Sequence, residues 1–141
     1  MANAPPDGPS RGQRPALMPR RLRPGAVIGV AAPAGPFERP AFERGFRALG
    51  DMGFEVVVPP EVFAACNFLA GPDEQRAAVF NRLMADPAID AVICARGGYG
   101  CLRVLPHVDY DAIARDPKPV IGFSDVTALL WALYSRCGLI G

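Results

Sequence analysis

Short apolar runs alternate with amphipathic segments along this chain, and that alternation constrains the fold more than any other feature. Four runs have the character of strands that are buried on both faces: residues 26–32, 54–58, 89–95 and 120–123. The segments between them repeat apolar side chains at helical spacing, as at Phe42, Phe46 and Leu49. Strands that alternate with helices form right-handed βαβ units, so the sequence predicts an α/β fold with an open, mostly parallel sheet and flanking helices.

The length and charge of the chain predict one domain behind a short leader. A chain of 141 residues, half of them hydrophobic, can bury a core of its own. Five arginines precede residue 24 against a single acid, Asp7, so residues 1–21 are expected to be a disordered Arg- and Pro-rich leader and residues 22–141 the α/β domain. Because the leader has no aromatic residue and no amphipathic period, no nucleic-acid partner is expected.

Other features bear on location and on the extent of the protein. The sequence has no run of the roughly 18 to 20 apolar residues that a membrane span needs, so no membrane partner and a cytoplasmic location are expected. Residues 139–141 resemble the opening of a fifth strand, and the chain is therefore expected to be the amino-terminal part of a longer protein that lacks its carboxyl-terminal domain.

Cofactor motifs are missing from the sequence. The four cysteines form no Cys-x-x-Cys pair, and with His107 as the single histidine they give no zinc-ligand spacing. Neither Gly-x-x-x-x-Gly-Lys-Ser/Thr nor Gly-x-Gly-x-x-Gly occurs. We expect no metal and no organic cofactor.

The most informative residue is Ser124, which ends the apolar run 120–123 immediately before a helical pattern. That placement lifts a hydroxyl to the carboxyl end of a strand, at the tip of a helix whose amides stabilise negative charge, as a serine nucleophile requires. The segment lacks the second glycine of the common Gly-x-Ser-x-Gly elbow. A helix N-cap by Ser124 or Asp125 explains the same residues and, from this segment alone, is the preferred interpretation.

Three loops, one of which contains Ser124, are expected to lie together at the edge where an open α/β sheet binds ligands, beyond the carboxyl ends of its strands. They are residues 33–36, 96–100 and 124–125. Gly98 and Asp125 are the candidate backbone amides of an oxyanion hole, although a tight turn at Gly97 and Gly98 is the commoner role of such a pair. The candidate substrate-binding residues of these loops are Pro33, Gly35, Arg96, Gly97 and Tyr99.

The general base is missing from this constellation. A serine hydroxyl needs an adjacent acceptor, usually a histidine that is oriented by a carboxylate. His107 lies in a polar connection between two short helical pieces, where a surface or capping role is expected. Cys101 is the alternative nucleophile, but the apolar residues after it indicate a packed helix and a buried thiol.

Several segments resemble segments of the amino-terminal domain of the LD-carboxypeptidase family and follow one another in the same order as in that domain. The family includes microcin-immunity peptidases. The matching stretches are residues 22–36, 68–76, 95–100 and 117–129. Two departures stand out: Phe68 occupies a position where the family often has tyrosine, and the leader has no counterpart in the family.

The resemblance implies a flavodoxin-like domain and a serine peptidase with a Ser-Glu-His triad. Ser124 would be the nucleophile, and the glutamate and histidine would come from the absent carboxyl-terminal domain, so the chain alone is expected to be inactive. The implied reaction is hydrolysis of the L,D bond to the terminal D-alanine of murein tetrapeptides in cytoplasmic cell-wall recycling of bacteria. The family uses no cofactor, and its members are commonly homodimers when complete.

Two alternatives remain open. An immunity-type peptidase that acts on peptidyl or aminoacyl nucleotides would use the same Ser124 and the same loops. A non-catalytic small-ligand binding module would use the same crevice without a base.

Overall fold

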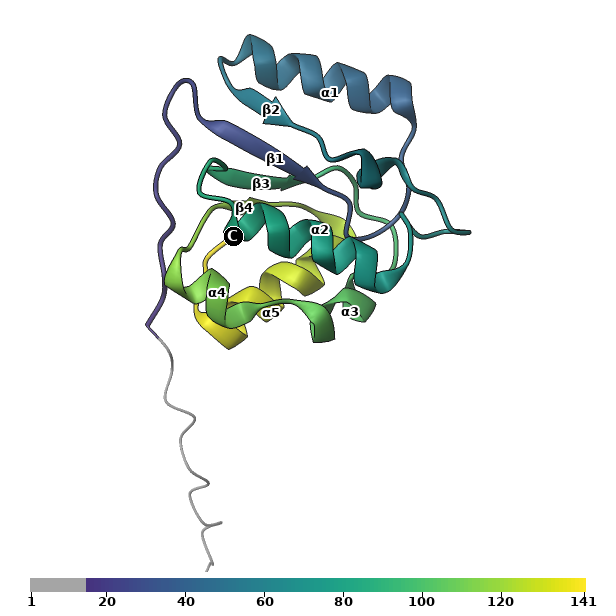
Figure 1. The fold of residues 1–141 in the computed structure, drawn as a ribbon. Coiled ribbons are helices and arrows are strands. Elements are labelled where there is room, and N and C mark those ends of the chain that lie inside the picture. The colour runs from purple at the N-terminus through teal and green to yellow at the C-terminus, as the bar shows by residue number, and fades with distance from the viewer. Residues whose placement is uncertain (1–14) are drawn as a thin grey trace, which may run out of the picture.

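A four-stranded, entirely parallel sheet organises the fold (Figure 1). The computed structural model describes residues 15–141. Its strands are β1 Val27–Ala31, β2 Glu55–Val57, β3 Ala91–Cys94 and β4 Val120–Ile121, in the spatial order β2-β1-β3-β4. The predicted α/β class with a parallel sheet is confirmed, and each strand is shorter than its apolar run because the ends of the runs enter loops. This is the flavodoxin-like order, in which the chain reverses direction between β1 and β3.

Helices cover the two faces of the sheet unequally. They are α1 Arg39–Asp51, α2 Asp73–Ala85, α3 Cys101–Val104, α4 Tyr110–Arg115 and α5 Thr127–Cys137. Figure 1 shows α2 to α5 together on one side of the sheet and α1 on the other. The arrangement follows from right-handed crossovers, because the chain moves one way across the sheet from β1 to β2 and the other way thereafter. Gly138, in the left-handed conformation at φ +81°, ends α5 where the sequence predicts.

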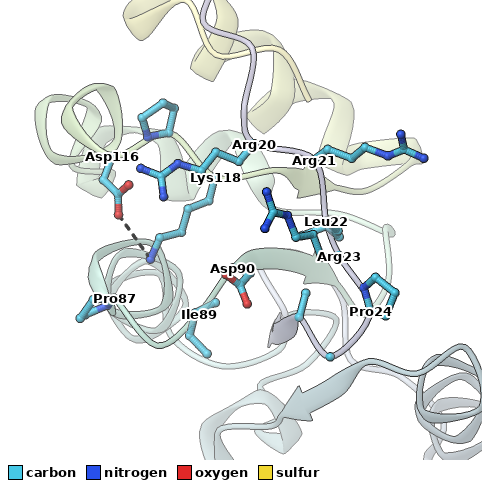
Figure 2. A pocket seen from close by; sticks show the side chains of 13 residues that line it. Arg20, Arg21, Leu22, Arg23, Pro24, Pro87, Ile89, Asp90, Asp116 and Lys118 are labelled. Atoms are coloured by element: carbon cyan, nitrogen blue, oxygen red, sulfur yellow. Dashed lines mark ion pairs between the residues drawn. The ribbon is translucent and has the colours of Figure 1, made fainter.

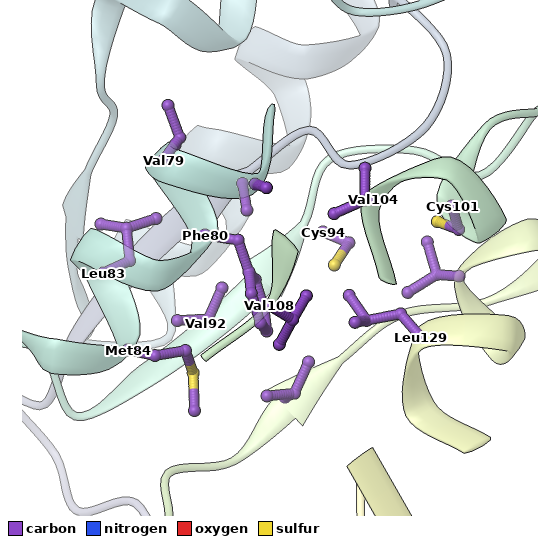
Figure 3. Packing of buried hydrophobic residues seen from close by; sticks show 14 of the residues in the cluster. Val79, Phe80, Leu83, Met84, Val92, Cys94, Cys101, Val104, Val108 and Leu129 are labelled. Atoms are coloured by element: carbon purple, nitrogen blue, oxygen red, sulfur yellow. The ribbon is translucent and has the colours of Figure 1, made fainter. Parts of the chain in front are cut away.

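The main core lies between the sheet and α2 to α5 (Figure 3). Phe80 is completely buried and belongs to one cluster with Val92 of β3 and with Val108, which lies in the connection before α4. Gly29 allows α2 to approach β1, because a β-carbon at this position would lie 2.7 Å from Cδ2 of Leu83. Removing a side chain such as Phe80 from a core of this density costs about 3–5 kcal/mol.

The helix α1 has the predicted apolar stripe but buries none of its residues fully. Phe42 stacks on Phe37 at a centroid distance of 4.8 Å and meets the edge of Phe63 at 5.4 Å. Phe46, one turn farther on, is 42% exposed. Aromatic contacts at one end therefore attach α1 to the domain.

The end of the predicted leader contacts the domain. Residues 1–14 lie outside the described residues, whereas residues 15–21 are described. Leu17 forms a parallel bridge with Leu139, accepting from the amide of Ile140 at 3.1 Å and donating to the carbonyl of Gly138 at 2.8 Å. The predicted fifth strand appears within residues 139–141 only as this bridge. Among residues 15–141, no helix combines the length and apolarity needed to cross a membrane.

Candidate active site

Ser124 occupies a sharp turn between β4 and α5. It is exposed and has a φ of +59°, a left-handed conformation that only one other non-glycine residue in the described chain, Asn67, adopts. A 3₁₀ turn, Ser124–Val126, leads directly into α5. Gly122 makes the turn possible, since a β-carbon there would lie 2.3 Å from Cγ1 of Val126. The backbone strain at Ser124 is typical of functional serines at such junctions.

The side chains of Ser124 and Asp125 do not cap the helix. No side-chain hydrogen bond caps either the 3₁₀ turn or α5, and within the described residues the Ser124 hydroxyl has no hydrogen-bond partner. Asp125 instead accepts from the amide of Cys101 through Oδ2 at 2.9 Å. The N-cap interpretation of these two residues is therefore wrong.

The 96–100 loop, which follows β3, lies directly against Ser124. A β-carbon on Gly97 would lie 2.7 Å from Cβ and 3.1 Å from Oγ of Ser124. Gly98 has a φ of +113° and approaches Gly35, whose amide donates to the carbonyl of Gly97 at 3.2 Å. The loops after β1, β3 and β4 thus meet where the strand order reverses, which is where open α/β sheets bind ligands.

The candidate substrate-binding residues divide into two groups. The first group is buried and consists of Pro33, Gly35 and Gly97. The carbonyl of Pro33 accepts a hydrogen bond from Arg76. Arg96 and Tyr99 are exposed; Arg96 donates through Nη1 to the carbonyl of Pro36 at 2.6 Å. Tyr99 meets the ring of Phe68 edge-on at 5.6 Å, and both rings are exposed.

Arg76 is a site-supporting residue that the sequence analysis missed. Its side chain, on α2, is 2% exposed and donates to the carbonyls of Gly71 at 3.1 Å, Gly100 at 3.2 Å and Pro33. A signal for it exists in the sequence, because Arg76 shares the i, i+4, i+7 stripe of Phe80 and Leu83, and a charge on an apolar face is informative.

Asp73 balances the charge of Arg76 at the start of α2. It pairs with Arg76 and, at 2.8 Å, with Arg103 of α3. Desolvation by burial would raise the pKa of Asp73, but the hydrogen bonds from Arg103 and Arg76 outweigh it and hold that pKa below its ordinary value. The carboxylate is therefore charged at neutral pH.

The cysteines near the site are unsuited to nucleophilic attack. Burial raises the pKa of Cys94 to about 12. Burial, and then the adjacent Asp125 carboxylate, raise the pKa of the Cys101 thiol. Because the thiolate is the reactive form, both groups are inert at neutral pH. The predicted buried thiol at Cys101 is confirmed.

His107 lies in the 3₁₀ turn Leu105–His107, between α3 and α4. Its backbone carbonyl accepts from Asn81 Nδ2 at 2.8 Å, and within residues 15–141 its exposed side chain has no hydrogen bond or ion pair. The contact expected of a catalytic base with Ser124 is thus missing from the described chain.

A cavity of about 980 Å³ lies at the opposite edge of the sheet, before β1, β3 and β4 (Figure 2). Arg20, Arg23 and Lys118 line it. The Lys118 ammonium is already held by the protein, since it donates to the carbonyl of Asp86 at the end of α2 and lies 3.8 Å from Asp116. This cavity is remote from the strand ends that carry Ser124.

Comparison with known proteins identifies the domain. The profile of the LD-carboxypeptidase N-terminal domain matches residues 28–141. A Streptomyces coelicolor relative named as a carboxypeptidase is 42% identical over 131 residues, which are 90% of this chain and 42% of the relative. The murein tetrapeptide carboxypeptidase of Pseudomonas aeruginosa is 38% identical over 113 residues, covering 79% of this chain and 36% of that protein.

A solved structure supports the same assignment. The microcin C7 self-immunity protein superimposes with a TM-score of 0.83 and 34% identity, covering 87% of this chain and 38% of that one. The same protein has been solved in complex with aspartyl sulfamoyl adenosine. The present chain therefore spans about two fifths of the length of the proteins it matches. Because the family profile covers nearly all of its described residues, the chain belongs to the LD-carboxypeptidase family, and residues 28–141 are its amino-terminal domain.

Proposed function

We propose that the full-length protein carrying this chain is a serine LD-carboxypeptidase with Ser124 as its nucleophile. The observation that carries the proposal is the turn at Ser124, which is exposed and has a strained backbone. This turn packs against Gly97, at the edge of the sheet where the strand order reverses between β1 and β3. A non-catalytic binding module has no need of a hydroxyl held in a left-handed backbone conformation, since such strain persists only where surrounding contacts enforce it.

The chemistry assigned to these residues is acyl transfer. The Ser124 oxygen attacks the scissile carbonyl while its proton passes to a histidine, which a glutamate orients; both belong to parts of the protein outside this chain. The amides of Gly98 and Asp125 stabilise the negative oxygen that develops. The carbon–nitrogen bond then breaks, D-alanine leaves with the proton from the histidine, and water hydrolyses the ester to regenerate Ser124.

The proposed substrates are murein tetrapeptides, from which the enzyme removes the terminal D-alanine in the cytoplasm. The similarity to a murein tetrapeptide carboxypeptidase supports this choice. Tyr99 and Phe68, exposed at 64% and 56%, offer an aromatic rim for the peptide beside Ser124. No cofactor is invoked, and a homodimer is the proposed state of the full-length protein.

A second candidate is an immunity-type peptidase that acts on aminoacyl nucleotides. It is favoured by the fold match to the microcin C7 immunity protein, which binds aspartyl sulfamoyl adenosine. Both candidates use Ser124, so the site geometry of this domain serves either. The discrimination between the two substrates would depend on residues outside this chain.

The two candidates are separated by substrate competition. Full-length protein is incubated with a murein tetrapeptide, and release of D-alanine is followed with increasing aspartyl sulfamoyl adenosine. If the protein is an LD-carboxypeptidase, we expect efficient release of D-alanine and only weak inhibition by aspartyl sulfamoyl adenosine. Negligible D-alanine release, together with tight binding of aspartyl sulfamoyl adenosine in a calorimetric titration, would favour the immunity-type peptidase. The 141-residue chain alone should release no D-alanine; efficient release by it would assign the base to this chain, with His107 as the first suspect.

A further inference from the structure

The peptide unit between Gly100 and Cys101 is held from both sides. Its carbonyl accepts from Arg76 Nη1 at 3.2 Å, and its amide donates to Asp125 Oδ2 at 2.9 Å. Gly100 has a φ of +113°, and a β-carbon there would lie 2.5 Å from Cδ2 of Leu69 and 3.2 Å from Nη1 of Arg76. This peptide unit ends the 96–100 loop and begins α3, so its position sets where the loop can lie.

The two side chains that hold this peptide come from opposite directions. Arg76 lies on α2, is almost completely buried, and also donates to the carbonyl of Pro33 in the loop after β1. Asp125 directly follows Ser124 at the start of the 3₁₀ turn. A continuous set of hydrogen bonds therefore runs from the neighbour of the nucleophile, through the Gly100–Cys101 peptide, to α2 and the loop after β1.

These hydrogen bonds matter for catalysis because they fix the loop that carries the proposed oxyanion donor. Oxyanion donors act only if they are already in place when charge develops, and they lose much of their effect when displaced. Gly98, the candidate donor, belongs to a loop of glycines with left-handed φ at Gly98 and Gly100, which has little conformational preference of its own. The bond from the charged Arg76 guanidinium is stronger than a neutral one, and the Asp125 side chain supplies an acceptor oxygen for the Cys101 amide, so both suit the task of fixing such a loop.

We infer that Arg76 and Asp125 are positioning residues. They clamp the Gly100–Cys101 peptide and thereby hold the backbone of Gly97 and Gly98 in its position against Ser124. The inference rests on the proposed function of Ser124. In this assignment the Asp125 side chain acts as a hydrogen-bond acceptor for the loop and takes no part in moving the proton of Ser124.

The first test separates an acceptor from a charge. In full-length protein, Asp125→Ala should lower kcat about 10- to 100-fold, by analogy with the loss that follows displacement of a reacting group by about 1 Å. Asp125→Asn retains an acceptor oxygen for the Cys101 amide and should recover most of the lost kcat. If Asn is as inactive as Ala while the protein stays folded, the side chain acts through its charge and the inference is overturned.

The second test asks whether the two residues form one clamp. Arg76→Lys keeps a buried cation but cannot hold all the carbonyls that the guanidinium reaches. It should lower kcat on its own, and the Arg76→Lys, Asp125→Ala double variant should lose less than the product of the two single losses. Multiplicative losses would contradict a shared clamp. The matched control is Arg82→Met, which removes another α2 arginine and its ion pair with Glu61, outside the site; it should leave kcat unchanged.

A third readout does not depend on activity. Hydrogen exchange in the peptide that spans residues 97–104 should be faster in Asp125→Ala than in the wild type, because the Cys101 amide loses its acceptor. Unchanged exchange would overturn the clamp even if kcat fell. Conversely, if wild-type protein and Ser124→Ala both fail to release D-alanine while this loop exchanges faster in Asp125→Ala, the proposed function fails and the clamp stands as a structural device.

Discussion

Gly97 and Ser124 are in such close contact that no side chain fits between them. A β-carbon at Gly97 would lie 2.7 Å from Cβ of Ser124, a separation that real side chains do not adopt, and 3.1 Å from its hydroxyl oxygen. The loop after β3 and the turn after β4 can meet only through a glycine at this point. Ser124, the proposed nucleophile, is therefore coupled sterically to the proposed oxyanion loop, and its neighbour Asp125 is coupled to the same loop by a hydrogen bond.

Replacing Gly97 with alanine should move Ser124. We expect Gly97→Ala to lower kcat about 10²-fold, the loss typical of a misplacement of about 1 Å in a reacting group. Gly45→Ala is the matched control, because Gly45 lies within α1 with open space around it, and alanine is the better helix former. Steady-state D-alanine release by full-length protein measures both. Equal kcat for Gly97→Ala and the wild type would show that the contact has no bearing on catalysis.

The role of Gly98 is tested by a larger side chain. Gly98→Val should lower kcat by about 10²-fold or more if the Gly98 amide is an oxyanion donor that the substitution displaces. Gly25→Val is the control: it also places valine at a positive φ, here +81°, but with nothing within 4 Å and at the edge of the sheet remote from Ser124. Gly25→Val should keep its kcat. An unchanged kcat in Gly98→Val would reject Gly98 as a donor.

Asp73 should make stability depend on pH in the acid range. Its pKa is lower in the folded protein, so its ion pairs stabilise the fold fully above the ordinary aspartate value of about 4 and are lost as pH falls through the folded-state pKa. Asp73→Asn should therefore lower Tm at pH 7 and flatten the decline of Tm below about pH 4.

The control for Asp73 is Glu74→Gln, in the same first turn of α2 but without an ion pair among the described residues. Thermal unfolding between pH 7 and pH 3 gives the comparison. Parallel Tm profiles for Asp73→Asn and the wild type would show that the network with Arg76 and Arg103 does not contribute to stability.

The elements that periodicity specifies could be predicted from the sequence, and long-range contacts could not. The alternation of apolar runs and helical stripes predicts the parallel sheet, and the apolar run before Ser124 predicts its turn. The hydrogen bonds of Arg76 join residues up to 43 positions apart, which no local pattern encodes. The pattern predicts the side chain of Asp125 at a helix cap because aspartate is favoured there, whereas in the structure this side chain accepts from the amide of Cys101.

The strand lengths and α1 show a second limit of local patterns. The run 120–123 predicts four strand residues, but β4 contains two, because Gly122 and Phe123 already belong to the turn that presents Ser124. Likewise, the apolar stripe of α1 predicts a helix correctly and says nothing of how much of that stripe the domain covers. Partial exposure of Phe46 depends on neighbours that are distant in the sequence.

The most direct measurement of the central claim is release of D-alanine from a murein tetrapeptide by full-length wild-type protein, by Ser124→Ala and by Ser135→Ala. Ser135 is the control because it is a serine of α5 whose hydroxyl donates to the carbonyl of Ala132, within the helix. We predict turnover by the wild type and Ser135→Ala, and a loss of about 10⁴-fold or more in kcat for Ser124→Ala, as for removal of a triad nucleophile. Turnover by Ser124→Ala at the wild-type rate would contradict the assignment of Ser124 as the nucleophile.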